Sequence, residues 1–289
     1  MNCESVLRPN KFFIRDGDMK CDPRFLNHPD VLIRHCQSLV SYERKSGIVR
    51  FTHFTVEEFI RQHCLHRMLT FVDLARDCLT YLTFDVFETG PCQDVRSLIE
   101  GLETHRFSDY AVRFWGAYVR GIGERDPKVK SLLCRLLSSN QILRSLRQVQ
   151  LYDNEMIDSL DHSFWLIALG GWTPLHFLAQ VGLAEFCANL VVSVAGESAP
   201  TINTSNVQQA LHEHGIVQSF CQGINSCDFS GLTPIHICAQ HGHEEMLKFL
   251  LSQKANAALQ NEFGTTPVHV AAQNGHSAIL QLLREAMPM

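Results

Sequence analysis

The sequence predicts a mainly helical protein built from three successive parts. These are a small α+β unit with one β-hairpin, a helical connector, and a solenoid of short helical repeats. Three observations carry this prediction: a motif that recurs in the second half, helical spacing of apolar residues in the middle, and a short apolar alternation in the first half. The chain has 289 residues, 45% hydrophobic and 19% charged, so it can bury a core.

The recurring motif appears three times in the second half of the chain. Its copies read GWTPLHFLAQVGL from Gly171, GLTPIHICAQHGH from Gly231 and GTTPVHVAAQNGH from Gly264. The last two copies begin 33 residues apart, and the first two begin 60 residues apart. This pattern resembles the ankyrin repeat, which implies pairs of antiparallel helices joined by turns. We expect copies at residues 166–193, 224–256 and 257–289, with residues 194–220 as either an insertion or a degenerate repeat.

Each motif residue has a physical reason for its place. The threonine caps the first helix, the proline sits where a missing N–H costs nothing, and the later glycine takes the left-handed conformation that ends the helix. The motif histidine could suggest catalysis, but in the resembled family it bonds the backbone between neighbouring repeats, and we expect the same here. These positions are Thr173, Thr233 and Thr266; Pro174, Pro234 and Pro267; His176, His236 and His269; and Gly182, Gly242 and Gly275.

The first half begins with a predicted helix at residues 30–40, a turn at RKSG, and a strand. The strand alternates Val49, Phe51 and His53, which implies one buried face and a buried, hydrogen-bonded His53. Thr55 with Glu58 predicts a capping box for the next helix. A second box, Thr70 with Asp73, opens a helix whose apolar stripe is Phe71, Leu74, Cys78 and Leu82, with Tyr81 beside it.

Three stretches of this half share an order found in one family. LIRHCQSLVSYERKSGIVRFTHFTVEEFI is followed by DLARDCLTYLTFD and then by SDYAVRFWGAYV. Together with the repeats they resemble the part of fungal NACHT-type signalling ATPases (STAND proteins) that follows the ATPase. The resemblance implies a winged-helix-like domain at residues 1–90, a helical connector at residues 91–165 and ankyrin repeats at residues 166–289.

The phosphate-binding loop of that family is missing from the sequence. The nearest stretch, GIGERDPK from Gly121, has the wrong glycine spacing, a proline before the lysine and no Ser or Thr after it. We therefore expect no ATPase in this chain. It would be a truncated gene product, a separately encoded half, or a paralogue that kept the sensor side.

Two further helical patterns belong to the connector. Ala111, Phe114, Trp115 and Tyr118 form a stripe that we assign to the core. Residues 127–151 read as a basic amphipathic pair of helices, which we expect to pack the connector against the first repeat.

Charge and cysteine content limit the function classes. Residues 1–150 carry 22 Lys+Arg and 18 Asp+Glu, whereas residues 151–289 carry 3 and 12, which indicates two units of different kinds. The eleven cysteines contain no C-x-x-C pair, and the clustered histidines lack metal-site spacing, so we expect reduced core cysteines and no metal or cofactor. No signal or membrane segment is evident, which predicts a cytoplasmic protein, with the nucleus as the alternative.

We therefore predict a non-enzymatic protein–protein interaction module of a fungal NLR-like signalling or non-self recognition protein. Its partner is an unidentified protein, with intact NACHT-type ATPases as candidates, and neither nucleic acid nor membrane. The alternative is a DNA-binding regulator whose winged helix uses Arg44, Lys45 and Arg50, although nearby Glu residues would repel phosphate. A hydrolase hidden in the Cys and His content is a third reading. The expected partner-binding residues lie on the concave face of the repeats: Trp172, Gln180, Val181, Phe229, Ser230, Leu232, Gln240, His241, Glu262, Phe263, Thr265, Gln273 and Asn274.

Overall fold

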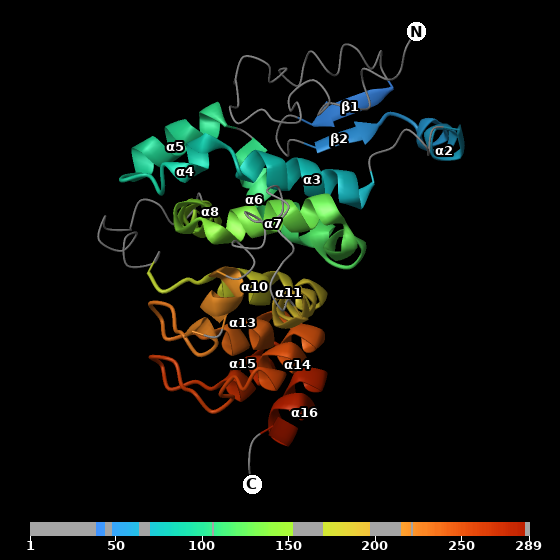
Figure 1. Ribbon diagram of the computed structural model, residues 1–289. Helices are drawn as coiled ribbons and strands as arrows, with labels where there is room; N and C mark the ends of the chain where they lie inside the picture. The colour runs from blue at the N-terminus through green and yellow to red at the C-terminus, as the bar shows by residue number, and fades with distance from the viewer. Residues whose placement is uncertain are drawn as a thin grey trace.

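The computed structural model describes residues 39–43, 48–63, 70–105, 107–152, 170–196, 215–220 and 222–286. These residues are mainly helical, with a helical unit stacked on the repeats (Figure 1). The elements before the repeats are β1 (Val40–Glu43), β2 (Ile48–Phe51), α2 (Phe54–His63), α3 (Phe71–Leu82), α4 (Asp85–Glu88), α5 (Val95–Thr104), α6 (Phe107–Val119), η5 (Ile122–Arg125), α7 (Pro127–Ser138) and α8 (Asn140–Leu151). The repeats comprise α10 (Pro174–Val181), α11 (Ala184–Gly196), α13 (Pro234–His241), α14 (Glu244–Ser252), α15 (Pro267–Gln273) and α16 (Ser277–Ala286).

The first described residues form two short antiparallel strands followed by α2. Strand β1 pairs with β2 so that Val40 lies opposite Phe51. The predicted helix at residues 30–40 falls mostly outside the described residues, and its last residue belongs to β1. The side chains of both strands also lie outside the description. The buried face expected from the alternation, and with it the winged-helix interpretation, therefore stays a prediction.

His53 differs from its prediction. It follows β2 instead of lying within it, and its side chain is exposed. Its Nδ1 accepts a hydrogen bond from the backbone N–H of Thr55 (3.3 Å) and lies 2.8 Å from the Thr55 hydroxyl. Helix α2 already begins at Phe54, so the capping box expected from Thr55 and Glu58 is wrong, and the imidazole of His53 occupies the helix start instead.

Helices α3 to α8 form one helical unit. Helix α3 packs against α6 and α7, and α8 packs against α4 and α6, so the predicted domain boundary at residue 90 divides helices that share a core. The Thr70–Asp73 capping box is confirmed. Cys78 and Leu82 of the predicted stripe are buried, but Phe71 is 72% exposed at the first turn. In the connector stripe assigned to the core, Ala111 and Trp115 are buried, Tyr118 is half-buried, and Phe114 is 45% exposed, so the assignment is wrong for Phe114.

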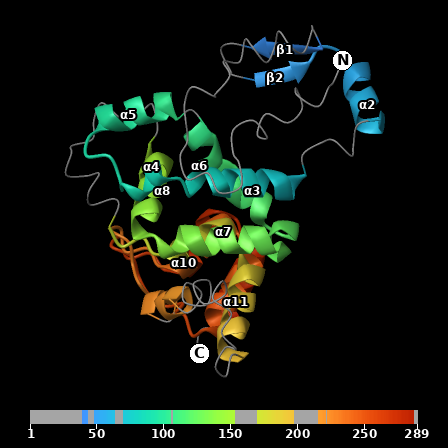
Figure 2. The same ribbon diagram turned by 45° about the horizontal axis from the view of Figure 1, so that its top comes forward.

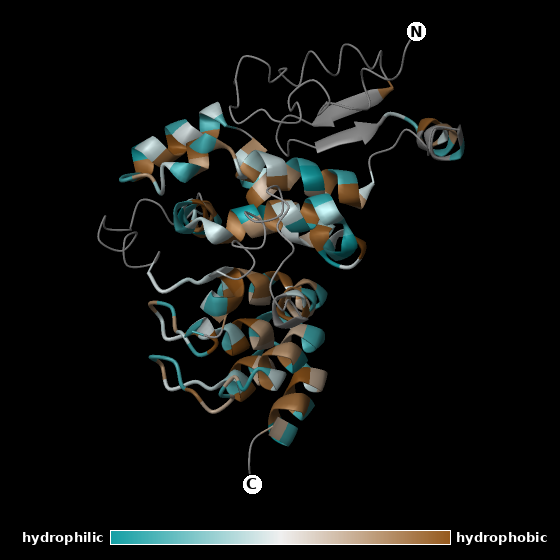
Figure 3. Ribbon diagram, in the orientation of Figure 1, coloured by the Kyte–Doolittle hydropathy of each residue, from teal (hydrophilic) through white to brown (hydrophobic). Residues whose placement is uncertain are grey.

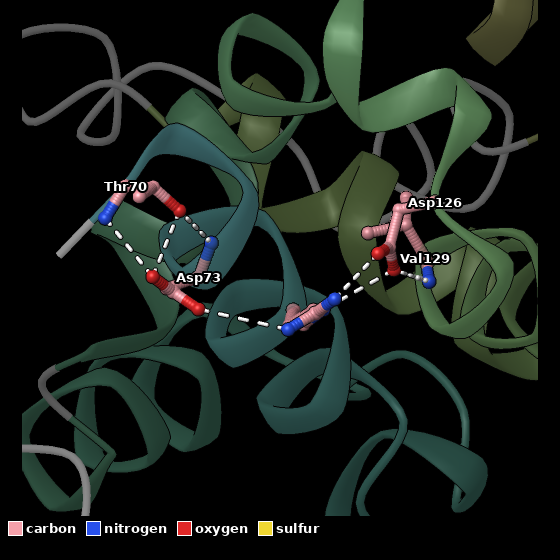
Figure 4. A network of polar contacts seen from close by, with 5 residues as sticks. Thr70, Asp73, Asp126 and Val129 are labelled. Carbon is pink, nitrogen blue, oxygen red and sulfur yellow. Dashed lines mark hydrogen bonds and ion pairs between the residues drawn. The ribbon is translucent and has the colours of Figure 1, made fainter.

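One arginine fastens α3 to the start of α7 (Figure 4). Arg76 Nε donates to Asp126 Oδ1 (3.1 Å), and Arg76 Nη2 donates to the other oxygen, while Arg76 Nη1 lies 3.6 Å from Asp73. Asp126 is also the N-cap of α7, because its Oδ1 accepts from the Val129 N–H at 2.9 Å. The Arg76 guanidinium lowers the pKa of Asp126. Asp126, in the segment GIGERDPK that is the nearest stretch to a phosphate-binding loop, thus caps α7 and ties it to α3.

The repeats stack as three helix pairs, α10–α11, α13–α14 and α15–α16, below the helical unit (Figures 1 and 2). Hydrophobic residues are concentrated on these helices (Figure 3). Residues 215–220 are also helical, and Ile216 and Phe220 within them are buried. The preceding residues 197–214 lie outside the described part, so whether residues 194–220 are an insertion or a degenerate repeat stays open.

The helical unit and the first repeat are in direct contact. Of the basic helices predicted at residues 127–151, α8 takes part through Arg147, which stacks on Trp172, and α6 and η5 take part as well. Gly116 of α6 sits so close to α10 that a Cβ there would lie 2.5 Å from the Val181 side chain. Glu124, which is 4% exposed, accepts hydrogen bonds from the N–H groups of Gly121 (3.0 Å) and Phe186 (2.8 Å). A buried carboxylate that satisfies two backbone donors in different units fixes the angle between them.

Candidate partner-binding surface

The motif histidines connect neighbouring repeats. In His176, Nδ1 accepts from the Thr173 N–H (3.2 Å), and Nε2–H donates to the carbonyl oxygen of Leu232 in the next repeat (3.0 Å). His236 makes the same pair of contacts and reaches the carbonyl oxygen of Thr265 at 3.2 Å. Burial lowers the pKa of His176 to about 4, so it is neutral at physiological pH. The structural role predicted for these two histidines is confirmed.

A second set of histidines runs in the opposite direction, and the sequence analysis missed its bonding role. His243 and His276 stand between the two helices of their own repeats. Their Nε2–H groups donate back to Gln180 O (2.9 Å) and Gln240 O (3.1 Å), at the ends of the preceding repeats' first helices. The recurrence of His after His-Gly (His243) and after Asn-Gly (His276) was the available signal. Each repeat interface is therefore held by one forward and one backward imidazole.

Trp172 does not lie on an open surface, which corrects its assignment as a partner anchor. Its side chain is 8% exposed, and the guanidinium of Arg147 on α8 stacks 3.7 Å from its ring centroid. Burial lowers the pKa of Arg147 to about 10, and the carboxylate of Asp228 opposes that shift. The helical unit thus covers the position that would be a free turn tip in an isolated repeat. Gln180 and Val181, the other expected residues of this copy, are half-buried at the same junction.

The expected residues of the second and third copies are more open. Phe263 is 79% exposed at the turn before α15, whereas Phe229 is half-buried at the corresponding turn. Ser230, Leu232 and Thr265 are half-buried, and their backbone N–H groups bond to the side chains of Asp228 or Asn261. The remaining five positions are exposed: Gln240, His241, Glu262, Gln273 and Asn274.

The inner helices beside these residues carry no fixed charge, although Glu262 at the turn before α15 does. The first helices of the three repeats, α10, α13 and α15, contain no Asp, Glu, Lys or Arg. Where α10 and α13 end, their residues meet α6 around a pocket of about 350 Å³. Its polar lining includes Arg113, Arg120, Gln150, Gln180 and His241. Such an arrangement offers hydrogen bonds and positive charge at a concave junction.

Other candidate chemistry is not assembled in the described residues. Within them, no three His, Cys, Asp or Glu side chains converge as a metal site would require. Six described cysteines are free thiols, four of them buried as predicted, while Cys227 is exposed. Arg44 and Lys45 of the DNA-binding alternative lie outside the described residues. No helix in the described ranges is long and apolar enough to cross a membrane.

Comparison with known families agrees with the repeat geometry. A family model described as ankyrin repeats (3 copies) matches residues 207–288. The match begins within the ambiguous residues 194–220, and the copy at Gly171 lies before it. No curated protein gives a significant match to this chain. Ankyrin repeats are therefore present in the second half, and this fold is a non-enzymatic one that binds proteins.

Proposed function

We propose that this chain is a non-enzymatic interaction module whose protein partner binds the concave face of the ankyrin array. The observation that carries the proposal is Phe263, an aromatic ring 79% exposed at a turn tip beside the uncharged inner helices. Burial of such a ring against a partner stabilises the complex, and aromatic side chains dominate many protein interfaces. Among the sequence-predicted anchors, Phe263 is the one most open to a partner.

We also propose a place for this module in a larger system. The resemblance of residues 27–119 to the region that follows a NACHT-type ATPase supports a regulatory role in fungal non-self recognition or related signalling. Intact NACHT-type ATPases are accordingly candidate partners.

Site-specific photo-crosslinking tests the proposed face. A photoreactive phenylalanine analogue at position 263 of the full chain should crosslink the partner, which mass spectrometry then identifies. Val192, 70% exposed on the outer helix α11, provides a matched apolar control position. Crosslinking of the same protein from position 192 alone would show that the outer helices bind the partner and would contradict the proposal.

The identified partner then permits a quantitative test. Phe263→Ala should weaken its binding by about 2 kcal/mol, the cost of truncating an aromatic anchor. Its melting temperature should stay unchanged, because the exposed ring supports little of the fold. Val192→Ala serves as the control and should change neither quantity. Full affinity in the Phe263 variant would exclude this ring as an anchor.

A further inference from the structure

The pocket between α6 and the repeats has a charge pattern that a general concave binding face does not explain. Arg113 on α6 and Arg120 directly after this helix line one side of the pocket, while Gln180, His241 and His243 line it from the repeats. Among the described residues that line this pocket there is no carboxylate. Residues 151–289, which include the repeats, have a net negative charge. The positive charge beside the concave face therefore comes from the helical unit.

Arg120 is the more available of the two arginines. Arg113 already pairs with Asp109 (2.6 Å) and donates to the carbonyl oxygen of Tyr152 (3.2 Å). Arg120 is exposed, and within the described residues it has no ion pair. Its contact is Nη1 to His243 Nδ1 at 3.2 Å, which leaves other guanidinium N–H groups able to donate.

The neighbouring helix ends do not use this positive charge. A cation near the end of a helix commonly binds the last carbonyl groups. Here the carbonyl oxygen of Gln180 at the end of α10 is taken by His243, and that of Gln240 at the end of α13 is taken by His276. The C-terminal capping role is thus filled by imidazoles, and the guanidinium remains for an external anion.

Two glutamine side chains that line the pocket have amide oxygens available to accept hydrogen bonds from a ligand. The Oε1 atoms of Gln150 and Gln180 are buried, and neither has a donor within the described part of the chain. Turning either amide into the pocket gives up no hydrogen bond of that oxygen. A peptide backbone supplies N–H groups for such acceptors, whereas a simple inorganic anion does not.

We propose that the pocket binds an acidic side chain in an extended segment of the partner protein, with Arg120 as its principal ligand. Arg113 adds a second positive group, and the segment continues along α10, α13 and α15, where no fixed charge opposes it. This inference rests on the proposed function and names the chemistry of its partner. The match is one of charge: an acidic segment meets a basic pocket at the end of three inner helices that contain no charged residue.

Fluorescence anisotropy with the full chain tests the proposal. The probe is a labelled peptide in which Glu alternates with Leu, and its counterpart has Gln in place of Glu. The acidic peptide should bind more tightly, and Arg120→Gln should weaken it about tenfold, equivalent to about 1.4 kcal/mol. Arg120→Lys should retain much of the affinity. The matched control Arg96→Gln, at an exposed site on α5, should change the affinity less than about twofold.

Several results would overturn the proposal. These are equal binding of the two peptides, equal losses in the Arg120 and Arg96 variants, or a single-stranded oligonucleotide that binds through Arg120 more tightly than the acidic peptide. Full displacement of the peptide by millimolar inorganic phosphate would indicate a small-anion site instead. If the peptide binds only after the Asp and Glu residues within positions 153–161 are replaced by Asn and Gln, the chain's own acidic residues compete for the pocket. That result would refute a free partner site. Thermal melting of each variant checks that Arg120→Gln remains folded.

The outcome can be separated from that of the proposed function. If Arg120→Gln has no effect while Phe263→Ala still weakens the identified partner, the acidic pocket is wrong and the interaction face stands. If Phe263→Ala has no effect while the acidic peptide depends on Arg120, the pocket stands and the turn-tip assignment fails.

Discussion

Replacing Gly242 by alanine should destabilise the array through two additive effects. Gly242 has φ of +74° at the end of α13, where an L-residue with a side chain costs about 1–2 kcal/mol. A Cβ at this position would also lie 2.7 Å from Cε1 of His276. The imidazole must then move, which endangers its hydrogen bond to Gln240 O, worth about 1 kcal/mol. The expected loss in the free energy of unfolding is about 2–3 kcal/mol in total.

Gly275 provides the matched control. Its φ is +75°, but a Cβ there would have no atom within 4 Å. Gly275→Ala should therefore lose only the conformational part, about 1–2 kcal/mol. Urea unfolding followed by circular dichroism measures both. In the Gly242→Ala background, His276→Ala should cost less than it does alone, because it removes the clash. Equal losses for the two glycine variants, with no coupling to His276, would refute the explanation.

Two further predictions concern pH and the junction. The pKa of His176 is about 4 in the folded chain and near 6.5 in the unfolded chain, so the unfolded state binds more protons between these two pH values. The stabilisation that the neutral imidazole of His176 contributes is therefore complete above pH 6.5. It falls by on the order of 3 kcal/mol as the pH drops towards 4. Urea unfolding at a series of pH values should show this loss, and His176→Gln should have a shallower slope if the imidazole is its source. Glu124→Gln should cost about 1–3 kcal/mol, because the single amide oxygen cannot accept from both backbone donors. Glu185→Gln, at a half-buried site, weakens only the pair with the exposed Arg125 and should cost clearly less. Similar melting temperatures for these two variants would argue against Glu124 as the junction's anchor.

The repeats were predictable because their motif residues determine local geometry. A Thr-Pro pair fixes a helix start and a glycine with positive φ fixes its end, so Thr173 and Gly182 reveal their roles without tertiary information. The Thr70 cap was predictable for the same reason. The position of His53 was not, because one alternation cannot show where a strand ends and a helix begins.

The environment of Trp172 required the structure. Its sequence position is that of an exposed turn residue, and only the packing of α8 against the repeat brings Arg147 over its ring. The pocket at Arg120 was hidden for a similar reason, since Arg120 and His243, which meet there, are 123 residues apart in the sequence. Contacts between units depend on how they are stacked, and no local pattern encodes that arrangement.

Because the helical unit covers the first repeat, a further repeat could be added to the array more easily after α16 than before α10. At the first repeat, Gly116 lies directly against Val181, and an extra repeat inserted there would separate the surfaces that match. At the other end, His269 keeps its cap bond to Thr266, while its Nε2 has no bond to a following turn among the described residues. A new repeat added after α16 could offer the turn carbonyl that His176 and His236 already use. Duplication of a repeat after α16 would therefore lengthen the array without rebuilding the pocket at its start.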